Sequence, residues 1–168
     1  MDEIFLKYSA DKLRQYESRI EDCLKRLPDE QIWARNSGSQ NAIGNLVLHV
    51  CGNLGQWILS GVGGAVDTRD RDAEFAARDG LTGAELATRL RERVEASSKV
   101  IESLNVERLK DRVKIQKYEI TLLEAIYHVV VHFAEHTGQV IFVTKLFSSD
   151  DLGFYKHLSQ AAHTERTP

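Results

Sequence analysis

Three histidines at successive four-residue steps are the residues of this sequence best suited to chemistry. His128, His132 and His136 lie in the segment YHVVVHFAEHTGQ. In an α-helix, residues four apart share one face and are separated by about 6 Å along the axis, so an adjacent pair can hold one metal ion through imidazole nitrogens. The outer two lie about 12 Å apart along the axis, so a regular helix cannot bring all three to one ion. One of the three must therefore have another role.

A ligand from elsewhere in the chain would complete an open metal site, because three protein ligands leave one position for water or substrate. His49 is the best candidate, since it stands in an otherwise apolar segment where an imidazole needs a partner. Asn53 shares its side of the expected helix, whereas Cys51 points away and is expected to be a core residue. A structural role is the alternative, because a buried histidine is more often simply hydrogen-bonded.

The fourth segment also matches one of two zinc-peptidase motifs. The H-E-x-x-H motif fails because Phe133 stands where its general base would be. Residues 132–136 do match the inverted motif, H-x-x-E-H, with Glu135 as the base. Such a peptidase would need a further carboxylate ligand well downstream, where Glu165 is the one glutamate that follows. We therefore rank a peptidase behind other metal sites, with Glu135 either a polar surface residue or one that orients an imidazole.

The composition fits a single domain over residues 1–168 and excludes several classes of partner. The 168 residues are 42% hydrophobic and 28% charged, and a chain of this length needs neither a disulfide nor a metal to fold. The 22 Lys and Arg against 25 Asp and Glu give a net charge of −3, which argues against nucleic acid. The acidic start MDEIFLK, the lack of a long apolar run and only two cysteines predict a cytoplasmic protein with no membrane span and reduced thiols.

The elements that must position the histidines are predicted to be helices. Pro28 and Pro168 are the two prolines, and apolar residues recur at three- and four-residue steps through long segments. The capping-box spacings Thr82–Glu85 and Thr121–Glu124 mark the start of the third and fourth segments. We expect a four-helix bundle with helices over residues 4–27, 43–59, 82–105 and 121–147.

Three segments between and after the helices have other patterns. Residues 65–80 are charge-dense and weakly periodic, which predicts a long crossover between the second and third helices. Within it, Arg71 and Glu74 either fold over a pocket or remain solvated. Residues 111–119 alternate in part and are expected to form a short extended arm. The tail from Asp150 predicts a short closing helix.

The sequence resembles the DinB-like superfamily, which includes the YfiT-type metalloenzymes, over nearly its whole length. The resemblance rests on NLVLH at residues 45–49, RDAEF at 71–75 and HVVVHFAEHTGQ at 128–139. It implies an all-α four-helix bundle, commonly dimeric. It also implies a divalent metal ion bound by one histidine of the second helix and an H-x-x-x-H pair of the fourth.

The resemblance assigns the metal ligands to His49, His132 and His136, because residues 137–139 set the register of the motif. It leaves His128 outside the ligand set. Many relatives have H-H-R-G-Q at the end of this motif, whereas this chain has E-H-T-G-Q. The missing basic residue removes the basis for expecting an anionic substrate contact at that position.

The remaining expectations concern the surroundings of the metal. Asn53, Gln139 and His128 are candidates to contact substrate or to hydrogen-bond a ligand, and Gln139 shares a helical stripe with the H-x-x-x-H pair. A role for Gln139 in interhelical hydrogen bonds is the alternative. Trp57 and Phe142 have helical spacing that favours core packing over a cavity wall.

The resemblance implies two chemistries. Some DinB-like proteins resemble transferases in which a metal activates a bacillithiol- or mycothiol-type cosubstrate, and the same kind of ion can activate water for hydrolysis. We therefore expect a thiol-dependent transferase or a hydrolase with a small-molecule substrate, using Zn or Ni, or else Fe or Mn. The competing hypothesis is a non-enzymatic homodimeric bundle with a structural metal site.

Overall fold

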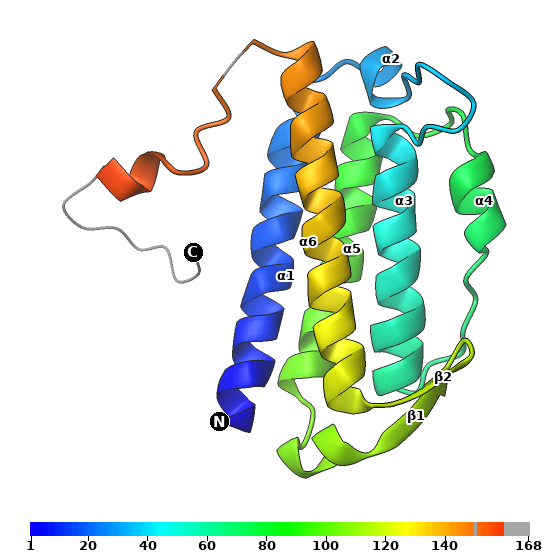
Figure 1. The fold of residues 1–168 in the computed structure, drawn as a ribbon, viewed down its shortest axis with the longest axis vertical. Coiled ribbons are helices and arrows are strands. Elements are labelled where there is room, and N and C mark those ends of the chain that lie inside the picture. Colours follow the sequence, from blue (N-terminus) through cyan, green and yellow to red (C-terminus); the bar gives the residue numbers. More distant parts are fainter. Residues whose placement is uncertain (150, 160–168) are drawn as a thin grey trace.

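Four long helices run side by side in the computed structural model, which describes residues 1–149 and 151–159 (Figure 1). α1 packs against α5 and α6, and α3 packs against the same two helices. The predicted all-α bundle is therefore confirmed. Residues 150 and 160–168, which the expected domain includes, lie outside the described residues. The bundle helices are α1 (Asp2–Leu24), α3 (Ile43–Leu54), α5 (Gly83–Glu102) and α6 (Leu122–Phe147).

Two helices begin with the capping boxes that the sequence predicts. Thr82 Oγ1 accepts a hydrogen bond from the Glu85 N–H at 3.2 Å, and the Glu85 carboxylate accepts one from the Thr82 N–H at 2.8 Å. Thr121 and Glu124 make the same pair of bonds at 3.2 and 2.7 Å. Each box satisfies backbone donors that have no partner within the helix, which stabilises the start of α5 and of α6 by about 1 kcal/mol.

The second bundle helix changes its winding after Leu54. It continues as a π-helix, η1 (Gly55–Val62), and the Gly63 N–H then reaches back five residues to the Ile58 carbonyl at 2.8 Å. The prediction of a helix over residues 43–59 is correct, but the apolar periodicity did not indicate this wider turn. π-turns are rare and occur often at functional sites.

The crossover between the second and third helices carries a short helix, α4 (Arg71–Ala76). Figure 1 shows α4 on the outer side of α3. Asn45 on α3 fastens it, because its side-chain amide donates to the carbonyls of Glu74 and Ala77 at 2.9 Å each. Another short helix, α2 (Asp29–Ile32), follows Pro28.

Residues 112–121 form a β-hairpin where the sequence predicts one extended arm. β1 (Arg112–Ile115) pairs antiparallel with β2 (Tyr118–Thr121) after a 3₁₀ turn, η2 (Val106–Lys110). The two-residue connection places Gln116 at φ +56°. The hairpin contacts η1 and α6, so it closes one end of the bundle. The tail contains a short 3₁₀ helix, η3 (Lys156–Ser159), in agreement with the expected closing helix.

The core lies between the four helices and is apolar. Burying each large aliphatic or aromatic side chain contributes roughly 1.5–3 kcal/mol. Cys23 and Cys51 are free and buried, as predicted, and burial raises the pKa of the Cys51 thiol to about 12. No helix in the described part of the chain is long and apolar enough to cross a membrane. The largest fully buried side chains include Leu13, Ile20, Leu54, Ile58, Leu90 and Phe133.

Candidate metal centre

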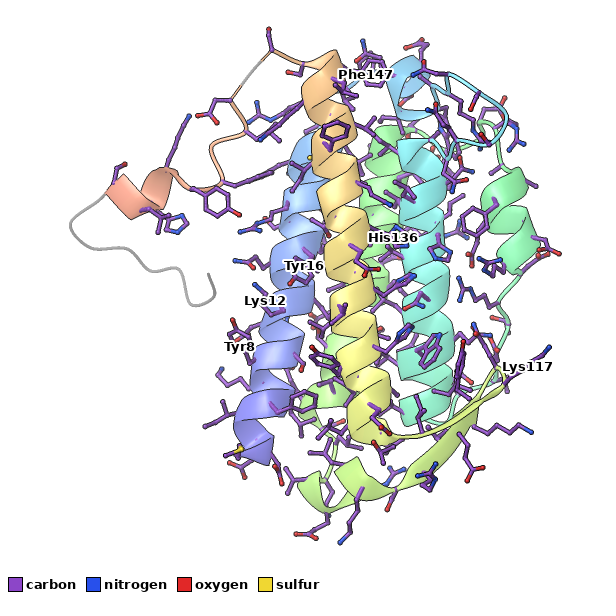
Figure 2. All side chains as sticks on the ribbon, in the orientation of Figure 1. Tyr8, Lys12, Tyr16, Lys117, His136 and Phe147 are labelled. Atoms are coloured by element: carbon purple, nitrogen blue, oxygen red, sulfur yellow. The ribbon has the colours of Figure 1, made fainter. Side chains whose placement is uncertain are left out.

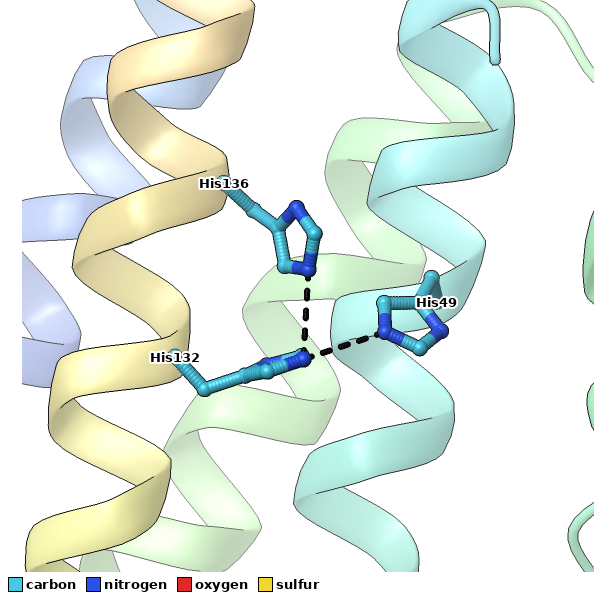
Figure 3. Close-up of side chains that lie close together, drawn as sticks. All are labelled: His49, His132 and His136. Carbon is cyan, nitrogen blue, oxygen red and sulfur yellow. Dashed lines mark hydrogen bonds between the residues drawn. The ribbon is translucent and has the colours of Figure 1, made fainter. Parts of the chain in front are cut away.

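Three imidazoles from two helices meet inside the bundle (Figure 3). His49 comes from α3, and His132 and His136 come from α6. The Nε2 atom of His132 lies 3.1 Å from that of His49 and 3.2 Å from that of His136. Zinc binds imidazole nitrogen at about 2.0–2.1 Å, so ligand nitrogens around a tetrahedral ion are about 3.3 Å apart. The three histidines therefore form a group able to hold one metal ion.

The hydrogen bonds on the outer side of two rings direct lone pairs into the cluster. Nδ1 of His136 donates to Gln139 Oε1 at 2.7 Å, and Nδ1 of His49 donates to Glu74 Oε2 at 3.0 Å. A neutral imidazole carries one N–H, so both Nε2 atoms present a lone pair toward His132. His132 can donate one proton to one of them at most. Two inward lone pairs in a buried site are the arrangement that metal ligation requires.

Burial keeps the two imidazoles of α6 uncharged. Burial, followed by the neighbouring His136 and His49, lowers the pKa of His132 to about 3. Burial also lowers the pKa of His136, although the bond to Gln139 acts in the opposite direction. Both imidazoles are consequently neutral at neutral pH, and no proton has to leave them before a metal ion binds.

An ion pair from the crossover lies behind His49. Arg69 donates from Nε and Nη2 to the two carboxylate oxygens of Glu74 at 2.8 and 2.9 Å, and the two side chains are 4% and 9% exposed. Burial tends to raise the pKa of Glu74, but the hydrogen bonds from Arg69 and His49 hold it below its ordinary value. Arg69 Nη2 also lies 3.0 Å from His49 Nδ1. The Nδ1 atom of His49 can donate to the ionised Glu74 or accept from Arg69, and we assign its proton to the contact with Glu74 because Arg69 Nη2 already donates to that carboxylate.

A cavity of about 480 Å³ opens beside the histidines. This volume suits a small molecule, and the cavity gives the cluster an open side, which a closed structural site lacks. The hairpin forms one wall, although the sequence indicated no functional role for it. The lining side chains come from α3, η1, the crossover, the hairpin and α6, and include His49, Asn53, Trp57, Arg71, Tyr118, His128 and His132.

The three auxiliary candidates occupy different places. Asn53 is buried and lines the cavity one turn after His49. Gln139 is exposed and bonds His136. His128 lines the cavity but does not belong to the group of three. Figure 2 shows His136 about halfway along α6, between that helix and α3.

The structure also places three further residues that the sequence singled out, Glu135, Trp57 and Phe142. Glu135 is exposed on α6, and within the described residues no hydrogen bond joins it to the three histidines. Trp57 is buried and also lines the cavity, so it is both a core residue and a wall residue. The expectation that Phe142 packs in the core is wrong, because its side chain is 64% exposed. α6 is apolar on both its inner and outer faces, so periodicity alone did not identify the buried one.

Two residues of the site, Arg69 and Gly52, were not predicted from the sequence. A Cβ atom at Gly52 would lie 1.8 Å from Glu74 Oε1 and 2.9 Å from Arg69 Nε, so this glycine makes room for the ion pair. A glycine inside a helix costs about 1 kcal/mol relative to alanine, and its position three residues after His49 was the available signal. Arg69 stands in a charge-dense crossover where no spacing distinguishes it from its neighbours.

The family assignment rests on nearly the whole chain. A family model described as a protein of unknown function, DUF1572, matches residues 1–162. The chain belongs to the DUF1572 family. A comparison of this DUF1572 protein with curated proteins finds no match.

Three solved structures resemble the DUF1572 protein. A conserved protein from Enterococcus faecalis is 15% identical, with 83% of this chain and 94% of that chain covered and a TM-score of 0.72. A DinB-like protein from Bacillus cereus is 14% identical over 79% of this chain and 85% of its own, with a TM-score of 0.64. The DinB-like protein YjoA from Bacillus subtilis is 13% identical over 88% and 97%, with a TM-score of 0.67. The DUF1572 protein thus has the DinB-like fold, which confirms the resemblance seen in the sequence.

Proposed function

We propose that this protein is a divalent-metal-dependent enzyme that acts on a small molecule, with His49, His132 and His136 as the metal ligands. The observation that carries the proposal is the convergence of three Nε2 atoms, 3.1 and 3.2 Å apart, beside an open cavity of about 480 Å³. A divalent ion, when bound, lowers the pKa of a coordinated thiol or water. Zinc and nickel suit a set of neutral imidazoles best, and iron and manganese are the further candidates.

A thiol-dependent transferase is the leading reaction class, with a bacillithiol- or mycothiol-type thiol added to an electrophile. In a hydrolase, a free carboxylate beside the metal can act as the general base that takes a proton from water. Glu124 lines the cavity, but its carboxylate is engaged by the N–H and hydroxyl of Thr121. Glu135 is exposed and bonds none of the three histidines within the described residues, so the peptidase motif gains no support. A hydrolase is the second candidate.

The side chains of the cavity have defined parts in this proposal. Trp57 and Tyr118, whose ring centroids are 6.2 Å apart, give an apolar surface that shields a bound substrate from water. The Asn53 amide and the His128 imidazole supply polar groups that can orient the substrate. Arg71 lines the same cavity with its guanidinium over the Phe75 ring at 4.9 Å. Arg71 can therefore contact an anionic group of the substrate, in place of the basic residue that the fourth-helix motif lacks.

Metal analysis tests the site and thiol chemistry tests the reaction. Purified wild type is expected to retain about one ion per chain, and His132→Ala and His136→Ala to lose most of it. Equal, near-zero metal in all three would refute the metal site. The metal-loaded protein is then incubated with bacillithiol, mycothiol or glutathione and a panel of electrophiles, each against a metal-only background. A rate no higher than that background in every combination would exclude the transferase.

We also propose that the protein is a homodimer, with the outer faces of α1 and α6 as the interface. Soluble monomers rarely expose large contiguous apolar patches. Figure 2 shows Tyr8 on the outer side of α1 and Phe147 near the end of α6. Light scattering should give twice the chain mass for wild type and the monomer mass for Phe142→Glu; a monomeric wild type would contradict the proposal. The exposed apolar side chains of these faces include Ile4, Tyr8, Tyr127, Val131, Phe142 and Leu146.

Dimerisation helps to distinguish the enzyme from the competing hypothesis of a non-enzymatic protein. If the protein binds metal and dimerises but no thiol or hydrolytic reaction exceeds background, the metal site is structural and the outer face of α6 is the functional surface. If activity is found, the cavity carries the function. Measuring both properties on the same preparation separates the two hypotheses.

A further inference from the structure

One chain of side-chain contacts connects the crossover to a single ring of the histidine cluster. It runs from Gln56 through Arg69 and Glu74 to Nδ1 of His49, by contacts of 3.1, 2.8 and 3.0 Å. Gln56 also accepts a hydrogen bond from Gln116 of the hairpin at 2.8 Å. A series of side chains from the hairpin, η1 and the crossover therefore reaches Nδ1 of His49, whereas Nε2 of the same ring faces the other two histidines.

We propose that Arg69 and Glu74 are positioning residues that fix the tautomer and orientation of His49, and thereby set the metal affinity of the cluster. The inference rests on the proposed metal site. It assigns to the crossover a role that goes beyond covering α3.

Without Arg69 and Glu74, His49 could adopt either of its two neutral tautomers. With the proton on Nδ1, Nε2 offers a lone pair to a metal ion; with the proton on Nε2, the ring can donate to His132, 3.1 Å away, and is blocked as a ligand. The ionised Glu74 carboxylate, 3.0 Å from Nδ1, accepts only and therefore favours the first form. Arg69 Nη2 lies 3.0 Å from the same Nδ1 and donates to Glu74 at 2.9 Å, so it is engaged when Nδ1 carries the proton; without Glu74 it would favour the second form. The Phe75 ring, with its centroid 4.8 Å from that of His49, packs against the imidazole and restricts its tilt.

Glu74 is itself held from several sides. Two hydrogen bonds from Arg69 fix both carboxylate oxygens, and the Asn45 amide fixes the Glu74 carbonyl at 2.9 Å. Gly52 leaves the space that the carboxylate occupies. A buried ion pair contributes little net stability, because desolvation offsets its attraction. Orientation of the imidazole is the effect that this geometry is suited to produce.

The test compares Glu74→Ala and Glu74→Gln with wild type by two measurements. Nitrogen chemical shifts of the metal-free protein report the His49 tautomer, and competition with a chelator reports the zinc affinity. Glu74→Ala should gain the Nε2–H tautomer and lose about 10- to 100-fold in affinity. Glu74→Gln, whose amide oxygen can still accept from Nδ1, should recover part of both. Asp72→Asn, an exposed acid on the same short helix, is the matched control and should resemble wild type.

A second variant perturbs the pair without changing its chemistry. Gly52→Ala forces the Glu74 carboxylate away from its place, since the added Cβ would lie 1.8 Å from Oε1. Its zinc affinity should fall as in Glu74→Ala, whereas Gly138→Ala, where a Cβ meets nothing within 4 Å, should leave it unchanged. This arm decides the matter if Glu74→Ala does not fold.

The inference is overturned if Glu74→Ala or Gly52→Ala folds, keeps the Nδ1–H tautomer and binds zinc within about twofold of wild type. Failure of the metal site itself has a different signature, because wild type would then bind no zinc. The tautomer measurement on metal-free protein still reports on Arg69 and Glu74 in that case.

Discussion

The imidazole of His128 packs against the indole of Trp57, with ring centroids 4.1 Å apart and the planes inclined by 38°. The same imidazole lies 5.6 Å from the ring of His132, measured between centroids. The stripe of three histidines on α6 is thus divided. Its last two members face His49, and its first belongs to the aromatic wall of the cavity.

His128→Ala should consequently keep the metal ion. The variant loses contacts with Trp57, which should lower the free energy of unfolding by about 1 kcal/mol and alter indole fluorescence. Elemental analysis beside wild type measures the metal content. Loss of the ion from this variant would show that the ligand assignment on α6 is shifted by one turn.

Gly61 should not tolerate a side chain. A Cβ there would lie 2.3 Å from Ile115 Cδ1 and 2.8 Å from its Cγ1, so Gly61→Ala must displace the buried Ile115 side chain of β1. We expect a loss of about 1–2 kcal/mol in the free energy of unfolding, measured by denaturant titration. Gly138→Ala is the control and should gain about 0.5–1 kcal/mol, because it is helical and unobstructed. Equal stability of the two variants would contradict the packing described for η1.

Glu17 should make stability depend on pH. Burial, reinforced by the neighbouring Glu21, raises the pKa of Glu17 from 4.5 to about 7. The folded state then binds this proton more tightly than the unfolded state, so the stabilisation is complete below the ordinary pKa and is lost as the pH rises through about 7. Glu17→Gln should flatten this fall and exceed wild type at about pH 8 by on the order of 1 kcal/mol. The free energy of unfolding is measured against pH for both proteins, and parallel profiles would contradict the prediction.

Ser97 is a polar residue without a polar partner. Its hydroxyl is buried on α5 and makes no hydrogen bond within the described residues. Ser97→Ala removes an unsatisfied group and improves helix propensity, so thermal unfolding should show a gain of about 1 kcal/mol. A loss of similar size would mean that the hydroxyl has a partner, such as a buried water.

The predictable part of the molecule is the part governed by local rules. Three- and four-residue apolar steps and the boxes at Thr82 and Thr121 define helices without reference to tertiary structure. The resemblance then aligned His49 with the H-x-x-x-H pair of the fourth helix. These signals were sufficient for the bundle and for the set of three histidines that converge.

The unpredicted part depends on contacts between distant segments. In the sequence, Arg69 is one of several charged residues of the crossover, and its role becomes visible only when α4 is placed against α3. The reason for a glycine at position 52 is likewise visible only from its contact with Glu74. The π-turn at Gly55–Val62 and the pairing of β1 with β2 arise from packing, which overrides periodicity. On α6, where both faces are apolar, the pattern could not separate Phe142 from the core.

His49 and His132 are 83 positions apart in the chain, yet their Nε2 atoms lie 3.1 Å from each other. An unfolded chain does not hold them together, so an ion that uses all three histidines binds the native state far more tightly than the unfolded state. By mass action, a free ion at one hundred times its dissociation constant adds about 2.7 kcal/mol to the stability. The heat resistance of the bundle should therefore follow the supply of metal, which would make the melting temperature an index of how well the surroundings furnish the ion.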